Sequence, residues 1–367
     1  MANKLKVGII GCGGIAFGKH MPSLSATGDV ELAAFFDAYP DAAKRALEEY
    51  GSTDARIYDS VDALVDDNKL DVVHICTPSG THREFAIKAL TAGKHVMCEK
   101  PMALTCADAE AMAETAKRMN KKLTIGVNNR FRADSQYLKK ICERGDLGEI
   151  YFAKALAVRR RAVPAWLLID EQEQGGGPLL DIGIHALDLT LWMMNNHKPK
   201  YVVGNVYNKL GKLKNESNIW GTWDPEKFFI EDSAFGFITM ENGATVILES
   251  AWALNIREDG EARTLLCGTN GGADMSDGLQ INGTELGGYY SKKVDFSKAM
   301  PSGVSNFDFS EPVNPYTSGL LEARSWVDAI LNDTEPVVKP EEGVALVKIL
   351  EGIRESALTG APVFFSG

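Results

Sequence analysis

The sequence predicts an α/β protein with an N-terminal doubly wound parallel sheet and a C-terminal α/β domain with an open, mostly antiparallel sheet. Two observations carry this prediction. Over residues 1–126 short apolar runs alternate with helical stretches, which is typical of a parallel sheet covered by helices on both faces. Within the second domain, residues 127–367, longer strand-like runs between residues 201 and 267 follow one another with turns and no intervening helix. Such a run favours an antiparallel or mixed sheet.

The first domain is expected to hold five strands and four helices between them. Each strand is a short apolar run, such as Lys6–Ile10, which stops at glycines. The expected strands are residues 6–10, 30–36, 71–76, 95–98 and 123–127, and the expected helices are 40–50, 63–68, 82–91 and 106–120.

The second domain is expected to hold strands at 201–208, 233–240, 244–252 and 263–267, with Glu241-Asn242-Gly243 as a turn. Two amphipathic helices, 319–332 and 341–359, close the chain, and Gly360 is a candidate C′ residue. We assign these helices to the second domain, with the alternative that they pack back on the first. The polar segment 283–315 is expected to be a long loop.

Composition excludes several classes of partner. The chain carries 39 Lys and Arg against 50 Asp and Glu, a net charge of −11, whereas nucleic acid and anionic membranes require a cationic face.

No run approaches the ~20 apolar residues of a membrane-spanning helix. The residues after Met1 lead straight into a strand, so we expect no cleaved leader. The six cysteines form no CxxC pair and have no His at zinc-ligand spacing, which favours a reducing cytoplasm.

A glycine-rich loop follows the first predicted strand. Gly11-Cys12-Gly13-Gly14-Ile15-Ala16 matches the pattern GxGxxG/A. The first glycine permits the tight turn, the second lets backbone approach a pyrophosphate, and the small third residue allows close helix packing. We therefore predict that the backbone of this loop binds a dinucleotide.

Asp37 stands at the end of the second strand, 21 residues beyond Ala16. A carboxylate there would accept hydrogen bonds from the adenosine ribose and repel a 2′-phosphate. Because Ala38-Tyr39-Pro40 supplies no Arg, NAD is preferred over NADP. The alternative is a plain glycine turn with Asp37 capping the next helix.

Two further strand ends carry polar residues. Thr77-Pro78-Ser79-Gly80-Thr81-His82 is a hydroxyl-bearing turn before a helix, and Glu99-Lys100-Pro101 places two charges directly after an apolar strand. In doubly wound sheets ligands bind beyond the carboxyl ends of the strands. The Lys100–Pro101 bond is a candidate for the cis form. The alternatives are an ordinary capped turn and a surface Lys–Glu pair.

A polar face marks an otherwise apolar helix. After Gly175-Gly176-Gly177-Pro178, the stretch from residue 181 to 194 is apolar except for Asp181, His185 and Asp188. Spacings of four and three place these three on one helix face. Each has a structural alternative: an N-cap, a satisfied core histidine and a structural hydrogen-bonding group. A metal site is a weaker alternative, because nothing supplies the rest of a coordination shell, and we predict none.

The chain resembles the Gfo/Idh/MocA family of NAD(P)-dependent sugar and cyclitol dehydrogenases. The resemblance rests on the order and spacing of GCGGIA, Asp37, TPSGTH, EKP and GGGPLLDIGIHALD. The resemblance spans nearly the whole chain. It implies a Rossmann domain, an α/β domain with an open mixed sheet, and a site between the two. It also implies that the open sheet forms an oligomer interface, as in a homodimer or homotetramer.

The resemblance implies roles residue by residue. Lys100 is the expected acid/base at the reacting hydroxyl, together with Asp181 and His185, and the choice of principal base between Lys100 and His185 stays open. The expected cofactor-binding set is Gly11, Cys12, Gly13, Gly14, Ile15, Asp37, Thr77, Pro78, Ser79, His82, Glu99, Lys100 and Asn128. The resemblance implies Arg130, Asp181 and His185 as substrate-binding residues, and the residue pattern described next adds Arg160 and Trp166 to this expected set.

Arg159-Arg160-Arg161 precedes Trp166 and suits an acidic or glycosylated substrate, with Trp166 stacked on a sugar face. Its alternative is a salt-bridged surface strand.

We predict a cytoplasmic NAD-dependent dehydrogenase that acts on a hydroxyl of a sugar, cyclitol or glycoside. Two alternatives stay open. One is a redox-neutral, NAD-dependent glycosidase that oxidises, eliminates, adds water and reduces again. The other is a non-catalytic dinucleotide-binding regulator.

Overall fold

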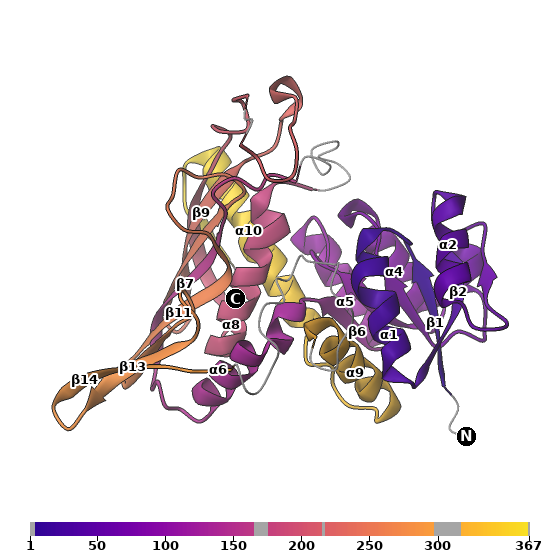
Figure 1. Cartoon of the computed structure of the whole chain (residues 1–367), viewed down its shortest axis with the longest axis horizontal. Helices are drawn as coiled ribbons and strands as arrows, with labels where there is room; N and C mark the ends of the chain where they lie inside the picture. Colours follow the sequence, from indigo (N-terminus) through magenta and orange to yellow (C-terminus); the bar gives the residue numbers. More distant parts are fainter. Residues whose placement is uncertain (1–3, 165–174, 215–216, 297–316, 366–367) are drawn as a thin grey trace. The chain divides into compact units, whose positions relative to one another are not determined.

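The structure is a computed structural model that describes residues 4–164, 175–214, 217–296 and 317–365. The chain divides into two compact units (Figure 1). The first unit comprises the described residues of Met1–Arg132 and Met300–Val344, and the second those of Ala133–Ala299 and Ala345–Gly367.

The first unit is built on a six-stranded sheet in which every pair of neighbours is parallel. Its order, β3-β2-β1-β4-β5-β6, is that of a doubly wound sheet. The strands are β1 (Leu5–Ile10), β2 (Val30–Phe36), β3 (Arg56–Ile57), β4 (Val72–Ile75), β5 (His95–Glu99) and β6 (Leu123–Gly126). All five predicted strands are therefore confirmed, and only the two-residue edge strand β3 lies outside the prediction.

Helices cover both faces of this sheet. They are η1 (Ala16–His20), α1 (Met21–Thr27), α2 (Pro40–Tyr50), α3 (Val61–Val65), η2 (Ser79–Thr81), α4 (His82–Thr91), α5 (Cys106–Arg118) and η3 (Asn128–Phe131). Residues of α1 and α2 join the buried cluster of β1, β2 and β4. α3 and α4 contact the strands as well, and α4 packs on α5.

The helix α9 (Ser318–Leu331) belongs to the first unit although it follows the second in sequence. Its residues Ala323, Trp326 and Val327 lie in the same buried cluster as Val7 and Ile9 of β1. This is the alternative arrangement considered for the terminal helices. The next helix, α10 (Pro340–Thr359), begins in the first unit and continues into the second.

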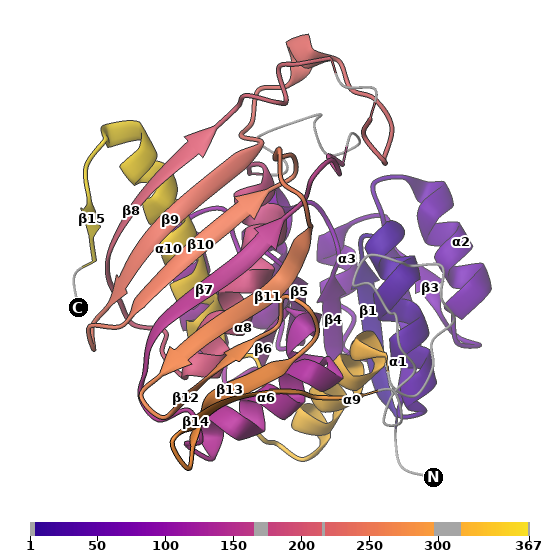
Figure 2. The ribbon, with the colours of Figure 1, turned by 60° about the vertical axis from the view of Figure 1, so that its left-hand side comes forward.

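The second unit is built on a nine-stranded sheet in the order β14-β13-β12-β11-β7-β10-β9-β8-β15. Only β7 and β10 run parallel, side by side in Figure 2, and all other neighbours are antiparallel. The strands are β7 (Ile150–Val158), β8 (Pro199–Tyr207), β9 (Ser233–Met240), β10 (Thr245–Ala251), β11 (Gly260–Gly268), β12 (Gly271–Asp274), β13 (Gln280–Glu285), β14 (Gly288–Lys293) and β15 (Val363–Phe364).

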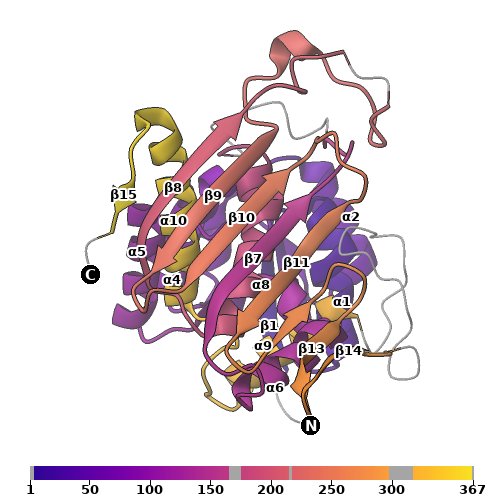
Figure 3. The ribbon, with the colours of Figure 1, turned by 90° about the vertical axis from the view of Figure 1, so that its left-hand side faces the viewer.

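The helices of this unit lie behind one face of the sheet in the view of Figure 3. They are α6 (Ala133–Glu143), η5 (Leu179–Gly183), α8 (Ile184–Met194) and most of α10, and η6 (Pro225–Lys227) lies in a loop. Along β9 and β10 the even-numbered residues face the helices and are buried. The opposite face exposes apolar side chains, among them Val203, Tyr207 and Phe237. The predicted open, mostly antiparallel sheet is thus confirmed.

The expectation of a long loop from residue 283 is wrong for its first part. β13 and β14 form a hairpin, with Leu286 and Gly287 at positive φ in the turn. All six residues of β14 are exposed, so no apolar alternation signals the strand. Residues 297–316 lie outside the described part of the chain.

Within the described residues, no helix is both long and apolar enough to cross a membrane.

Candidate functional site

The predicted cofactor-binding residues of the first unit follow the carboxyl ends of its strands. Gly11 follows β1, Asp37 follows β2, Thr77 follows β4, Lys100 follows β5 and Asn128 follows β6. Because the strands are parallel, these residues share one edge of the sheet. The topology therefore brings together positions that are up to 117 residues apart in sequence.

The glycine loop has the conformation that its sequence requires. Gly11 has φ of +88°, and a Cβ there would lie 2.8 Å from the carbonyl carbon of Cys76. At Gly13 and Gly14 an added Cβ would meet nothing within 4 Å, and both residues are exposed. The loop thus presents bare backbone to open space, as binding of a pyrophosphate demands.

Asp37 holds this loop from the neighbouring strand. Its Oδ2 accepts a hydrogen bond of 2.6 Å from the Cys12 amide, and its Oδ1 accepts one of 2.8 Å from the Tyr39 amide. The second contact closes a local turn. The alternative of Asp37 as a helix cap is wrong, because Tyr39 is the N-cap of α2 and no side chain caps this helix. The first contact ties Asp37 to the glycine loop. Asp37 is half-buried.

The helix after the loop contains a π-helical stretch, η1, which places two charged or polar side chains in the interior. The Lys19 Nζ lies 2.5 Å from the Glu99 Oε1 and 3.2 Å from the Glu322 Oε2. The His20 Nε2 lies 2.7 Å from the same Oε1 of Glu99. The other oxygen of Glu99 accepts a 3.2 Å hydrogen bond from the Lys100 amide.

This buried cluster fixes the charge of its members. Burial would raise the pKa of Glu99, but the charge of Lys19 and the hydrogen bonds from His20 and Lys19 hold it well below its ordinary value. Burial would lower the pKa of Lys19, but Glu322 and Glu99 raise it. Glu99 is therefore an ionised residue beside Lys100 whose carboxylate is engaged in the interior of the first unit.

His20 continues the cluster to His74. Their Nδ1 atoms are 3.0 Å apart, and since Nε2 of a neutral His20 donates to Glu99, its Nδ1 accepts from His74. Burial is the main cause that lowers the pKa of both histidines, which favours the neutral form. The His74 Nε2 has no hydrogen-bond partner among the described residues.

His82 joins the two turns that sequence singled out. One ring nitrogen lies 2.9 Å from the Thr77 carbonyl oxygen and the other 2.8 Å from that of Pro101. The Lys100–Pro101 bond is cis, as predicted. Burial lowers the pKa of His82, and a neutral ring donates to only one of these carbonyls at a time. The ring is 1% exposed, so its contacts join the turns.

The turn itself leaves Thr77 half-buried and Pro78 exposed, whereas Ser79 is buried. After β6, the Asn128 side chain donates a 3.3 Å hydrogen bond to the Ser318 hydroxyl of α9. Arg130 is 0% exposed, and its Nη1 lies 2.7 Å from Glu342 and 3.1 Å from the Val337 carbonyl oxygen. These contacts give Arg130 a structural role inside the first unit, and its contact with substrate stays a prediction.

In the second unit, the glycine run packs against the chain before β9. The Gly177 amide donates a 2.9 Å hydrogen bond to the Glu231 carboxylate. A Cβ on Gly177 would lie 2.1 Å from the Glu231 carbonyl oxygen, so only glycine fits. The π-helical segment η5 starts two residues later and carries Asp181.

The predicted helix is present, with Asp181 in the π-helical segment η5 and with His185 and Asp188 in α8, and a shared face for the three side chains stays a prediction. Asp181 is half-buried, His185 is 6% exposed, and Asp188 is fully buried. Asp181 accepts a 2.9 Å hydrogen bond at Oδ2 from the indole Nε1 of Trp252. Sequence reasoning missed Trp252, Lys19, His20 and His74, although the tryptophan directly after an apolar strand is a signal that could have singled it out.

The arginine cluster separates into different environments. Arg159 is buried, is ion-paired with Glu261 and lies 4.6 Å from the Trp220 ring centre. Arg161 donates a 2.9 Å hydrogen bond to the Leu254 carbonyl. Arg160 is exposed, and Trp166 lies outside the described residues. Arg159 thus forms an ion pair, as the alternative expected, but in a buried position after β7 and not on a surface strand. Arg160 stays a candidate for substrate binding.

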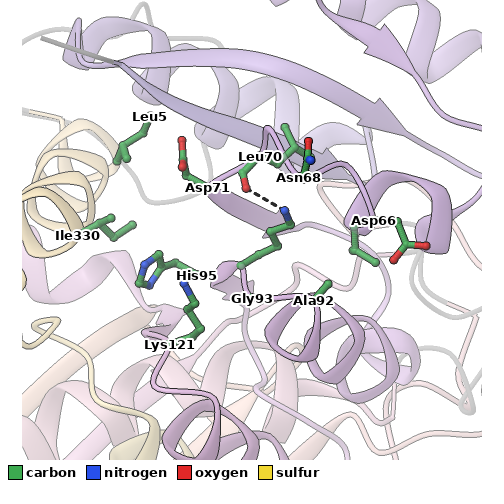
Figure 4. A pocket seen from close by; sticks show the side chains of 12 residues that line it. Leu5, Asp66, Asn68, Leu70, Asp71, Ala92, Gly93, His95, Lys121 and Ile330 are labelled. Carbon is green, nitrogen blue, oxygen red and sulfur yellow. Dashed lines mark hydrogen bonds between the residues drawn. The ribbon is translucent and has the colours of Figure 1, made fainter.

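A cavity of about 500 Å³ lies at the opposite edge of the first sheet (Figure 4). Its lining includes Leu5, Asp71, His95 and Lys121, which stand at or just before the amino ends of β1, β4, β5 and β6. The glycine loop is at the carboxyl ends, so this cavity is not the candidate cofactor site. Among the residues that the structure describes, no three His, Cys, Asp or Glu side chains are grouped to hold a metal ion.

Two family models match the chain. Residues 5–127 match the model described as an oxidoreductase family with an NAD-binding Rossmann fold, and residues 135–274 match the GFO/IDH/MocA C-terminal domain.

Named relatives are similar over half of the chain or more. The chain is 39% identical to D-glucoside 3-dehydrogenase of Escherichia coli over 275 aligned residues. The aligned region covers 75% of this chain and 78% of that protein. It is 32% identical to myo-inositol 2-dehydrogenase of Thermotoga maritima over 52% of this chain and 55% of that protein. The crystal structure of an aldose-aldose oxidoreductase from Caulobacter crescentus, complexed with glycerol, superimposes with a TM-score of 0.77 at 27% identity, covering 99% of this chain and 100% of that one.

Proposed function

Because the chain belongs to the Gfo/Idh/MocA family of oxidoreductases, we propose that it transfers hydride between a secondary hydroxyl of a carbohydrate-like substrate and NAD. The observation that carries the proposal is the shared strand edge of the first unit, where the glycine loop, Asp37 and Lys100 come together. We assign cofactor binding to the first unit and substrate binding to the second.

The residues present fit a nicotinamide dinucleotide. The bare backbone at Gly13 and Gly14 suits the pyrophosphate, and Asp37 suits the ribose hydroxyls. Thr77, Pro78 and Asn128, at the next strand ends, are the proposed contacts of the nicotinamide half. When bound, the nicotinamide supplies the hydride acceptor.

NAD is favoured over NADP by charge. A 2′-phosphate next to the Asp37 carboxylate would be repelled, and the exposed residues Ala38 and Tyr39 carry no cation to offset that repulsion. The expected result is a kcat/KM for NAD about 100-fold above that for NADP, which corresponds to roughly 2.7 kcal/mol.

Residues of the chain itself are proposed to accept the proton that the substrate hydroxyl loses. Oxidation of a secondary alcohol removes a hydride from carbon and a proton from oxygen, so a base must stand at that oxygen. We assign this role to Lys100 or His185, and we assign Asp181 to orientation of the substrate hydroxyl or of the base. The Glu99 contact to the Lys100 amide holds the backbone of Lys100 in place.

The proposed substrates are sugars, cyclitols and glycosides, in keeping with the glucoside and inositol dehydrogenases among the relatives. Arg160 is exposed and is the proposed contact for an acidic substituent.

We also propose that a second copy of the chain covers the open face of the second sheet. The exposed apolar side chains of that face support this proposal.

All six cysteines are free thiols, and three of them are buried, which supports a reducing, cytoplasmic location.

The test measures NADH or NADPH formation with a panel of sugars, cyclitols and glycosides, and glycoside cleavage in the same samples. The variants are Lys100→Ala and, as a matched control, Lys121→Ala at the opposite edge of the same sheet. NADH formation that is lost only in Lys100→Ala supports the dehydrogenase. Cleavage without net NADH supports the glycosidase, and cofactor binding with neither reaction supports the regulator.

A further inference from the structure

The end of β10 contacts the segment that carries Asp181 at two points. The Ser250 hydroxyl donates a 2.7 Å hydrogen bond to the Pro178 carbonyl, directly before η5. Two residues further on, the Trp252 indole donates its 2.9 Å hydrogen bond to Asp181. Trp252 is the first residue after β10, so both contacts come from the carboxyl end of this strand.

Trp252 is held rigidly. It is 0% exposed and is among the largest fully buried side chains of the described residues. Its amide donates a 3.0 Å hydrogen bond to the Asp232 carbonyl, and its own carbonyl accepts a 3.0 Å hydrogen bond from the Ala162 amide. Both the amide and the carbonyl of Trp252 are thus fixed. The indole can rotate only about two side-chain torsions, and close packing around the buried ring restricts both.

The chemistry of the indole suits a carboxylate held in one orientation. The indole N–H can donate a hydrogen bond but cannot accept one, so it pairs only with an acceptor such as a carboxylate oxygen. Asp181 lies in a π-helical segment, where the backbone departs from regular α-helix, and such segments recur at functional sites. A fixed donor therefore sets which way the carboxylate of this segment faces.

We propose that Trp252 is a positioning residue for the reaction, which acts by holding the Asp181 carboxylate through its indole N–H. The proposal rests on the role assigned to Asp181 in the proposed function. Trp252 itself is buried and takes no part in the chemistry. Its loss should lower the rate through Asp181 alone.

The decisive variant removes the donor and keeps the shape. Site-specific replacement of Trp252 by 3-benzothienylalanine exchanges the N–H for sulfur, and Trp252→Phe is the simpler companion. Each is expected to lower kcat by about 10- to 100-fold, the range for a hydrogen bond to a charged group, with a smaller effect on KM. Trp223→Phe is the matched control, because the Trp223 indole donates a 2.8 Å hydrogen bond to the Gly211 carbonyl and not to Asp181.

A double-mutant cycle separates positioning from structure. In an Asp181→Ala background, replacement of Trp252 should lower kcat no further, because the group that it holds is already gone. An equal loss in both backgrounds would make Trp252 a structural residue and overturn the proposal. So would an unchanged kcat in the benzothienylalanine variant.

A readout independent of activity is the indole N–H resonance. The chain has six tryptophans, and the signal of Trp252 is the one missing in Trp252→Phe. That signal should shift and exchange faster in Asp181→Ala, and an unmoved signal would contradict the contact. If Asp181→Ala keeps full activity while the signal does shift, the assignment of Asp181 in the proposed function has failed instead.

Discussion

The Lys19 ammonium lies 2.5 Å from the Glu99 carboxylate in the interior of the first unit, one residue before Lys100. The Glu322 carboxylate of α9 lies 3.2 Å from the same ammonium. One buried cation, on the helix after the glycine loop, therefore forms ion pairs with both the end of β5 and the helix α9, which is remote in sequence. Glu99 has a structural role here that sequence alone does not reveal.

Glu99→Gln should destabilise the first unit. The variant leaves Lys19 buried with the Glu322 carboxylate as its partner, and loss of one partner of a buried pair costs about 3 kcal/mol. Urea unfolding of the full chain measures the change. Glu84→Gln, which breaks an exposed i,i+4 pair with Lys88, is the matched control and should leave the midpoint unchanged. Equal midpoints for the two variants would refute the role of the cluster.

Stability should fall as the pH drops from about 6.5 toward 5. The pKa values of His20, His74 and His82 are lowered mainly by burial, and that of His95 is lowered to about 4 for the same main reason. Near pH 6 the unfolded chain binds more protons than the folded one, so acid favours unfolding. Burial raises the pKa of Glu231, which works in the opposite direction, but this is one carboxyl against four histidines.

Unfolding free energies measured between pH 5 and 7.5 test this sign. Each buried histidine contributes a slope of up to about 1.4 kcal/mol per pH unit in that window. His74→Phe removes one titrating ring, so its profile should be flatter than that of the parent chain. A parent profile without slope would show that these histidines are protonated in the folded state.

Gly13→Ala should separate folding from cofactor binding. A Cβ at Gly13 meets nothing within 4 Å, so the variant should unfold at the same denaturant concentration as the parent. The methyl group occupies the space that a pyrophosphate needs, so the Kd for NAD should rise by about 10-fold or more. Titration calorimetry measures the Kd. Gly11→Ala is the contrasting variant, because its φ of +88° and a 2.8 Å approach to Cys76 predict a loss of stability as well.

Phe237→Glu should test the open sheet face. Phe237 is 42% exposed on β9, on the face without helices, so a charge there is tolerated in a single copy of the chain. If two copies associate through this face, the variant should be smaller by light scattering at micromolar concentration while its unfolding midpoint is retained. A parent chain that is already monomeric would sink the proposed association.

The regular elements of the first unit could be predicted because their signals are local. α2 spans residues 40–50 as expected, since Pro40 starts the helix and Gly51 follows its end. The turn at Gly243 and the C′ position of Gly360 likewise have the positive φ that glycine favours. Each of these features depends on a few neighbouring residues.

The missed features depend on contacts that are remote in sequence. Trp252 and Asp181 are 71 residues apart, and Lys19 and Glu322 are joined only by the packing of α9. The buried ion pair of Arg130 could not be predicted, because its partner Glu342 lies 212 residues away in the sequence. Chemistry-bearing residue types were therefore visible in the sequence, while the division between site and support required the fold.

The central claim is hydride transfer between a substrate carbon and the nicotinamide ring. Its most direct test is incubation of the protein with NAD and a glycoside deuterated at its ring carbons, followed by mass spectrometry of the reduced cofactor. We predict that one deuterium passes from the substrate to the cofactor with the parent chain and that Lys100→Ala abolishes the transfer. Reduced cofactor without deuterium, or cleaved glycoside that retains all of its deuterium, would contradict the claim.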